Sequence, residues 1–200
     1  MDSGTLPCYS GAMPAELLNP NVLSDLPRSG LFLLYSRQAP NDFLLTLAVH
    51  LARTGQPLRV FDGCNGFDGY FVARLAYRLD PQPAPVLARI TLSRAFTCFQ
   101  LAQRIQTAPR TAEPLIILGL LDTFYDESVP LPEAERLLAE SLQSLRLLAE
   151  HAPVIVGTSE PRGLDAGRWV LLNRLQAAVD RVYAPAVPQE LPGMQQLVLF

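Results

Sequence analysis

Lysine is missing from this 200-residue chain: all sixteen basic residues other than its two histidines are arginine. Any mechanism that needs a lysine is therefore excluded within the chain, whether a Schiff base or the lysine that grips phosphate in a P-loop. Cysteine is also scarce, because the chain has three, far apart and without a CxxC pair. With so few cysteines and histidines, neither a disulfide framework nor a structural zinc site is expected.

Long apolar runs and targeting features are absent too. No apolar run approaches the ~20 residues of a membrane span, and the first residues, Met-Asp-Ser-Gly, lack the basic and apolar regions of a secretory signal. We therefore expect a cytoplasmic protein without membrane contact. The formal net charge of −3 argues against a protein held on nucleic acid by bulk charge. Hydrophobic residues make up 49% and charged residues 18% of the chain, a balance that excludes a disordered protein.

Short apolar runs rich in β-formers alternate with segments of helical period, the pattern of a parallel sheet flanked by helices. We therefore expect an α/β fold, a three-layer sandwich with a mixed, mainly parallel sheet, formed by residues 29–200. Residues 1–28 contain four prolines and are expected to form an N-terminal arm. The expected strands cover residues 30–35, 58–62, 86–93, 115–119, 153–158, 181–184 and 195–200, and the expected helices cover 41–54, 68–79, 97–106, 132–151 and 165–179.

Five segments carry motifs in a fixed order. In the first, residues 60–67, a strand ends in Asp62 and runs into a glycine-containing turn and a phenylalanine; in the second, residues 90–97, a strand ends in Arg-Ala-Phe before a helix. The others are the strand at 115–119 with the long helix after it, the strand at 153–158, and Ala-Val-Asp-Arg-Val at 178–182. Together they resemble the core domain of the RecA/RadA/KaiC-type recombinase superfamily over roughly residues 28–200. The resemblance implies a RecA-like P-loop NTPase fold.

The same resemblance assigns a nucleotide site, and the chain departs from the family at each catalytic position. A phosphate loop needs glycines, then lysine and Ser/Thr, whereas residues 35–42 contain no glycine, one proline, Asn41 in place of the lysine and Asp42 in place of the hydroxyl. Cys64 matches the acid that activates water, and Gly119 matches the magnesium-site aspartate. The degenerate nucleotide-site positions are thus Ser36, Arg37, Asn41, Asp42, Asp62, Cys64, Gly119 and Asp122, the last being the nearest substitute acid.

Loss of all these groups predicts a protein that does not hydrolyse ATP and holds neither a cofactor nor a metal. The resemblance implies a catalytically inactive, pseudo-ATPase protein that acts as a scaffold or accessory subunit, through a protein partner or self-association. Its family setting implies DNA recombination or repair.

Two alternatives remain open at this point. The loop after the strand at 153–158 carries Arg162 and Arg168, and in the superfamily this loop contacts single-stranded DNA, so the chain is alternatively a DNA-binding module. The third hypothesis is an enzyme with unrecognised chemistry around Asp62, Cys64 and Asp122, for instance a Cys–His pair formed with His50. Against it, Asp62 is expected to accept backbone N–H groups of the turn at 63–66.

Overall fold

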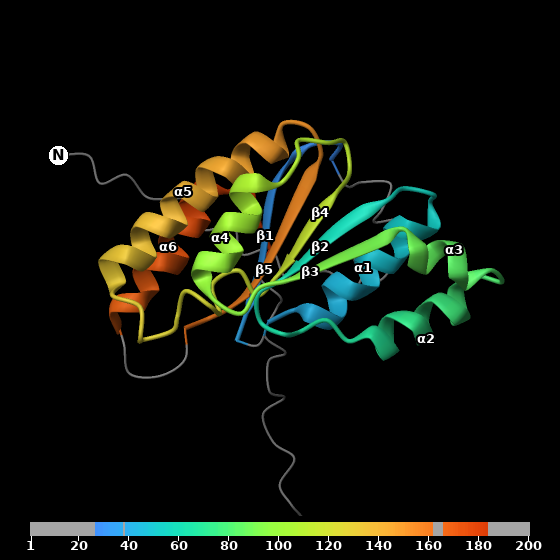
Figure 1. Cartoon of the computed structure of the whole chain (residues 1–200), viewed down its shortest axis with the longest axis horizontal. Coiled ribbons are helices and arrows are strands. Elements are labelled where there is room, and N and C mark those ends of the chain that lie inside the picture. Colours follow the sequence, from blue (N-terminus) through green and yellow to red (C-terminus); the bar gives the residue numbers. More distant parts are fainter. Residues whose placement is uncertain (1–26, 38, 162–165, 184–200) are drawn as a thin grey trace, which may run out of the picture.

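The computed structural model describes residues 27–37, 39–161 and 166–183, and these residues form alternating strands and helices (Figure 1). The strands are β1 (Gly30–Ser36), β2 (Leu58–Asp62), β3 (Ile90–Arg94), β4 (Leu115–Leu118), β5 (Pro153–Ser159) and β6 (Arg181–Tyr183). The helices are α1 (Asn41–Arg53), α2 (Gly69–Leu79), α3 (Pro83–Ala88), α4 (Cys98–Thr107), α5 (Leu131–Ala149) and α6 (Trp169–Ala178), with a 3-10 turn, η3 (Ala166–Arg168), before α6. In this part of the chain no helix has the length and apolar character needed to cross a membrane.

The six strands form one sheet in the order β3-β2-β4-β5-β1-β6, and every described pair is parallel. Helices α1, α2 and α3 lie on one face and α4, α5 and α6 on the other (Figure 1), each set packed over its own hydrophobic core. The expected α/β three-layer sandwich is therefore confirmed. The antiparallel part of a mixed sheet is not among the described strands, and both the strand expected at 195–200 and the arm expected at 1–28 lie mainly outside the described residues.

The two central strands explain why helices cover both faces. Every residue of β4 and β5 is buried, as expected of parallel strands enclosed on both sides. Because parallel strands all point the same way, the ends of β1, β2, β4 and β5 meet at one edge of the sheet. The segments that follow these strands are those in which the sequence places its candidate site.

One predicted strand starts too early. The strand expected over 86–93 is instead a short helix, α3, followed by β3. Pro83 stands in the first turn of α3, where the missing N–H of proline costs nothing, and Val86 is buried against the neighbouring helices and strands. An apolar run of this length has no period that distinguishes a buried helical turn from a strand.

The segment between β4 and α5 is tied to the start of α6 by a buried arginine. Arg168 is 5% exposed, and its two terminal amines each donate a hydrogen bond of 2.7 Å, one to the carbonyl of Phe124 and one to that of Val129. The guanidinium of Arg168 is therefore enclosed and bound to backbone oxygens, and this position lends no support to the expectation that Arg168 contacts DNA. Arg162, the other arginine of that hypothesis, lies outside the described residues.

We expect Arg168→Met to lower the free energy of unfolding by about 3 kcal/mol or more, because two buried carbonyls lose charge-assisted donors. Urea denaturation followed by circular dichroism measures the change. The matched control is Arg174→Met on α6, which removes an exposed ion pair of 2.7 Å with Glu135 and should cost less than about 1 kcal/mol. Equal losses for the two variants would contradict an anchoring role for Arg168.

Candidate functional site

A cavity of about 350 Å³ opens where the carboxyl ends of β1, β2, β4 and β5 meet. It brings together three of the residues that the sequence assigns to the nucleotide site, Asn41, Cys64 and Asp122. Its lining consists of Ala39, Asn41, Cys64, Asp122, Tyr125, Ser159 and Glu160. The topology thus places the predicted positions at one site, and the chemistry of that site depends on what each side chain contacts.

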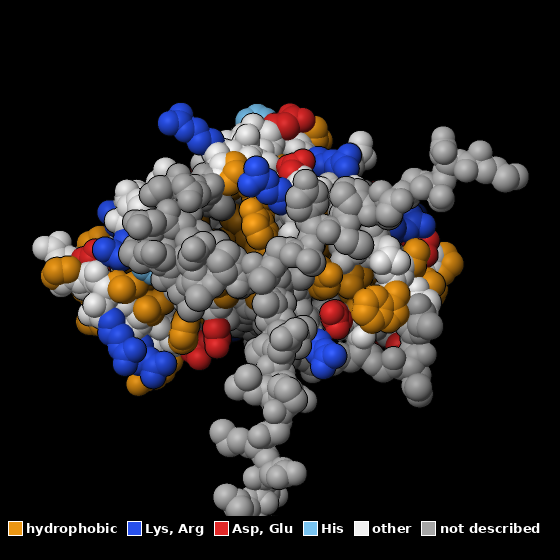
Figure 2. Space-filling view, turned by 180° about the vertical axis from the view of Figure 1, so that it is seen from behind, with side chains coloured by type: hydrophobic (Ala, Val, Ile, Leu, Met, Phe, Trp, Pro, Cys, Tyr) orange, Lys and Arg blue, Asp and Glu red, His pale blue; other side chains and the backbone are white. Residues whose placement is uncertain are grey.

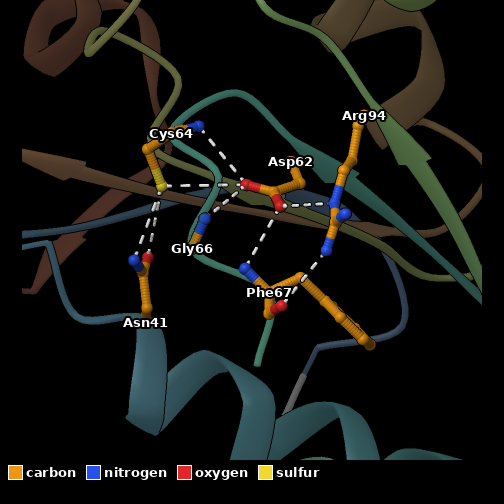
Figure 3. Close-up of polar contacts among 6 residues, drawn as sticks. All are labelled: Asn41, Asp62, Cys64, Gly66, Phe67 and Arg94. Carbon is orange, nitrogen blue, oxygen red and sulfur yellow. Dashed lines mark hydrogen bonds and ion pairs between the residues drawn. The ribbon is translucent and has the colours of Figure 1, made fainter. Parts of the chain in front are cut away.

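Asp62 organises the turn after β2 (Figure 3). Its side chain is buried, with one carboxylate oxygen accepting from the backbone N–H of Gly66 at 2.9 Å and of Cys64 at 3.3 Å. The other oxygen accepts from the N–H of Phe67 at 3.1 Å and lies 3.5 Å from Nε of Arg94. The prediction that Asp62 accepts backbone N–H groups is confirmed. Both carboxylate oxygens are engaged in shaping the loop, which positions Cys64 in the cavity.

Cys64 sits in the cavity wall as a protonated thiol. The side-chain amide of Asn41 donates to its sulfur at 3.4 Å, and Oδ1 of Asp62 lies 3.8 Å from the same sulfur (Figure 3). Burial, reinforced by the negative charges of Asp122 and Asp62, raises the pKa of Cys64 to about 11. A catalytic cysteine needs the opposite shift, because the thiolate is the nucleophile. Among the described contacts of Cys64, none is with His50, so the geometry does not form the Cys–His pair considered above.

Gly119 directly follows β4, at the position where the family resemblance calls for a magnesium-binding aspartate. Its φ of +62° is in the left-handed region that favours glycine. A Cβ added at this position would overlap Cβ of Cys64 and would lie 2.6 Å from both Sγ of Cys64 and Oδ2 of Asp122. The space that an acidic side chain would need at position 119 is therefore already filled, by Cys64 and by the carboxylate of Asp122.

The far wall of the cavity is acidic. Oδ1 of Asp122 accepts a hydrogen bond of 2.8 Å from the hydroxyl of Ser159, while the phenol of Tyr125 donates to the Ser159 carbonyl at 3.3 Å. Burial, together with the nearby carboxylate of Asp122, holds the pKa of Tyr125 well above its ordinary value. Glu160 completes this wall, and its backbone N–H donates to the carbonyl of Ser36. Among the described residues, the lining of the cavity thus presents two carboxylates and no cationic side chain.

The start of α1 is poorly suited to phosphate, although phosphate often binds at a helix N-terminus. Such sites rely on free backbone N–H groups and the positive end of the helix dipole. Here Pro40, which has no N–H, precedes the helix, and Asp42 is exposed in its first turn. Arg37 belongs to the loop after β1 and is not among the cavity-lining residues. A phosphate placed here would meet carboxylates instead of the lysine and glycine backbone of a P-loop.

Tyr125 and Arg94 belong to the site or its support but were not predicted from the sequence. Tyr125 lies three residues after Asp122, in a segment without regular structure, so neither its period nor its neighbours indicate its role. Arg94 was visible only as part of the Arg-Ala-Phe motif. Within the described residues, no group of three His, Cys, Asp or Glu side chains could hold a metal ion. Comparison with family models and with curated proteins gives no match for this chain.

Replacement of Gly119 by alanine tests how tightly the strand end is packed. We expect Gly119→Ala to lower the free energy of unfolding by about 3 kcal/mol, of which about 1 kcal/mol is left-handed backbone strain and the rest overpacking against Cys64. Gly55→Ala is the matched control, because Gly55 also has a positive φ, of +92°, but an added Cβ there meets no atom within 4 Å. Thermal or urea unfolding of both variants measures the difference. If the Gly119 variant is as stable as the Gly55 variant, Cys64 and Asp122 can move aside for the added methyl group, and the strand end is not tightly packed.

Proposed function

We propose that this chain is a RecA-like domain that has lost nucleotide hydrolysis and acts as a scaffold or accessory subunit through protein contacts, in DNA recombination or repair. The observation that carries the first part is the composition of the cavity at the strand ends. Its lining combines a protonated thiol, an amide and two carboxylates, and the lysine of a P-loop is absent from the whole chain.

The placement of the motifs supports the relation to RecA-like domains. The strand–loop–helix unit β1–α1 borders the cavity, as do the segment after β2, the segment after β4 and the end of β5. They include the segments to which the sequence resemblance assigns the phosphate loop, the water-activating acid and the magnesium site. A fold that keeps this layout while packing Gly119 against Cys64 retains the architecture without the chemistry.

Exposed aromatic side chains beside the edge strand support a role in protein contacts. Phe96 is 72% exposed and Phe99 is 49% exposed, and both follow β3 at the start of α4. Two phenylalanines left in water next to a strand at the edge of the described sheet are typical of interaction surfaces, because their burial by a partner is favourable. The hypothesis of an enzyme centred on Asp62, Cys64 and Asp122 has less support. Both carboxylate oxygens of Asp62 already accept hydrogen bonds from backbone N–H groups of the turn, and the Cys64 thiol stays protonated near neutral pH.

The first test is nucleotide binding. We expect isothermal titration calorimetry of the full chain with MgATP, and with MgADP, to show no binding at micromolar nucleotide concentration. The physical reason is electrostatic, because Asp122 and Glu160 face the position of the phosphates and no lysine offsets them.

A double variant, Asp122→Asn with Glu160→Gln, is the control for charge alone. It should still fail to bind, because removal of repulsion does not supply the glycine backbone and lysine that hold phosphate. Binding of MgATP by the unmodified chain with a micromolar dissociation constant would contradict the proposal.

The second test is association. If the chain assembles with itself, sedimentation velocity should show a mass that rises with concentration up to ~100 μM, and Phe96→Ser with Phe99→Ser should keep it monomeric because the apolar contact is lost. Gln103→Ser, an exposed change on the same helix, should leave the association unchanged. A monomer at all concentrations would exclude self-assembly and require a different protein as the partner.

A further inference from the structure

One face of α2 presents a row of aromatic and basic side chains. Tyr70, Arg74, Tyr77 and Arg78 follow one another at helical spacing and are all exposed, Tyr70 by 76% and Tyr77 by 71%. The opposite face of the helix packs inward through Val72 and Ala76. We call these four residues the α2 stripe. Two tyrosines this far out of the core have no role in holding the helix to the sheet.

The arginines of the α2 stripe have no carboxylate partner within the described residues. The guanidinium of Arg74 lies over the ring of Tyr70, 5.7 Å from its centroid, and no ion pair is formed by Arg78 in this part of the chain. The two aspartates that flank the helix are already engaged. Asp68 caps the helix by accepting from the N–H of Phe71, and Asp80 faces Arg53 at 4.0 Å. The positive charge of the stripe is therefore available to a ligand.

This end of the molecule is basic although the chain as a whole is acidic. Residues 68–94, which span α2 with its N-cap, α3 and β3, carry four arginines against two aspartates, a net charge of +2, whereas the whole chain has −3. Figure 1 shows α2 and α3 together at the outer end of the sheet, and Figure 2 shows arginine side chains beside hydrophobic ones at that end. The charge is thus concentrated where the exposed tyrosines lie.

We propose that the α2 stripe binds single-stranded nucleic acid, with Tyr70 and Tyr77 stacking bases and Arg74 and Arg78 contacting phosphates. Tyr70 and Tyr77 are two helical turns apart, about 10 Å along the axis, so each has room for a different base of one strand. Interleaved aromatic and arginine side chains are the means by which proteins hold single strands without reading their sequence. An acidic peptide would satisfy the arginines, but it has no flat rings for two solvent-facing tyrosines.

This proposal goes beyond the scaffold role and does not depend on it. It also places the nucleic-acid contact away from the loop that the sequence had indicated, in which Arg168 is bound to backbone carbonyls. The stripe lies on α2, and none of its residues lines the cavity at the strand ends. A failure of one proposal therefore leaves the other standing.

Fluorescence anisotropy with a labelled dT20 strand and the full chain tests the proposal. We expect binding at 50 mM NaCl that weakens as salt is raised, and a loss of at least tenfold in affinity for Tyr70→Ala with Tyr77→Ala. Tyr70→Phe with Tyr77→Phe should keep the affinity within about threefold of the unmodified chain, because phenylalanine still stacks. Arg74→Gln with Arg78→Gln should reduce the slope of log affinity against log salt by about 1.4.

The matched control is Arg104→Gln with Arg110→Gln, which removes the same charge from exposed positions away from α2. It should leave both affinity and salt slope close to those of the unmodified chain. Labelled rU20 in place of dT20 distinguishes RNA from DNA as the strand, and binding of either supports the proposal.

Four results would overturn the proposal. They are no binding of dT20 or rU20 at 50 mM NaCl, an equal loss in the Arg104 and Arg110 control, equal affinity for a 20-base-pair duplex, and displacement of dT20 by an equal concentration of poly-glutamate. The last two would mean that charge alone, without stacking, governs the contact. Because all the altered side chains are exposed, melting curves of the variants should match that of the unmodified chain, and the phenylalanine and glutamine variants decide the question if an alanine variant is unstable.

Discussion

Burial of the central strands on both faces is the constraint on which the rest of this molecule depends. Every residue of β4 and β5 is buried, so helices must cover each side of the sheet, and each crossover must return the chain in the same direction. The turns that follow the strands therefore lie together at the carboxyl edge of the sheet. The cavity, the Asp62 turn and the Gly119 strand end are neighbours for this reason, although about 120 residues separate Asn41 from Glu160 in the sequence.

At this edge, close packing and internal hydrogen bonds hold the loops in place. Cys64 rests against Gly119 on one side and Gly66 on the other, and an added Cβ at Gly66 would lie only 2.8 Å from its sulfur. The carboxylate of Asp62 accepts hydrogen bonds from three backbone N–H groups of the turn. Such a corner is stabilised by its own side chains and does not need phosphate to order it. The negative charges of Asp122 and Glu160 in the cavity lining disfavour binding of an anionic ligand.

Much of the fold could be predicted from the sequence, because buried strands appear as short apolar runs and amphipathic helices as apolar residues at helical spacing. The strand expected at 58–62 and the helix expected at 41–54 match β2 and α1 within one residue. The turn at Asp62 was predictable from local chemistry, since an aspartate before Gly-Cys-Asn-Gly has backbone donors within reach. Arg168 was not, because its partners are about 40 residues away in the chain and only the packed structure brings them close. The need for glycine at position 119 was not predictable either, because it depends on the position of Cys64 in the folded chain.

The link between Arg168 and the segment after β4 also determines how this region opens. That segment, from Gly119 to Pro130, has few backbone bonds of its own to regular structure, and two of its carbonyls are held from outside by one side chain. Local fluctuations that free η3 from the core would release both carbonyls at once, and loosening of the segment would in turn remove the partners of the guanidinium. The two pieces, distant in sequence, therefore form a single cooperative unit of native-state unfolding, which includes Tyr125 in the acidic wall of the cavity.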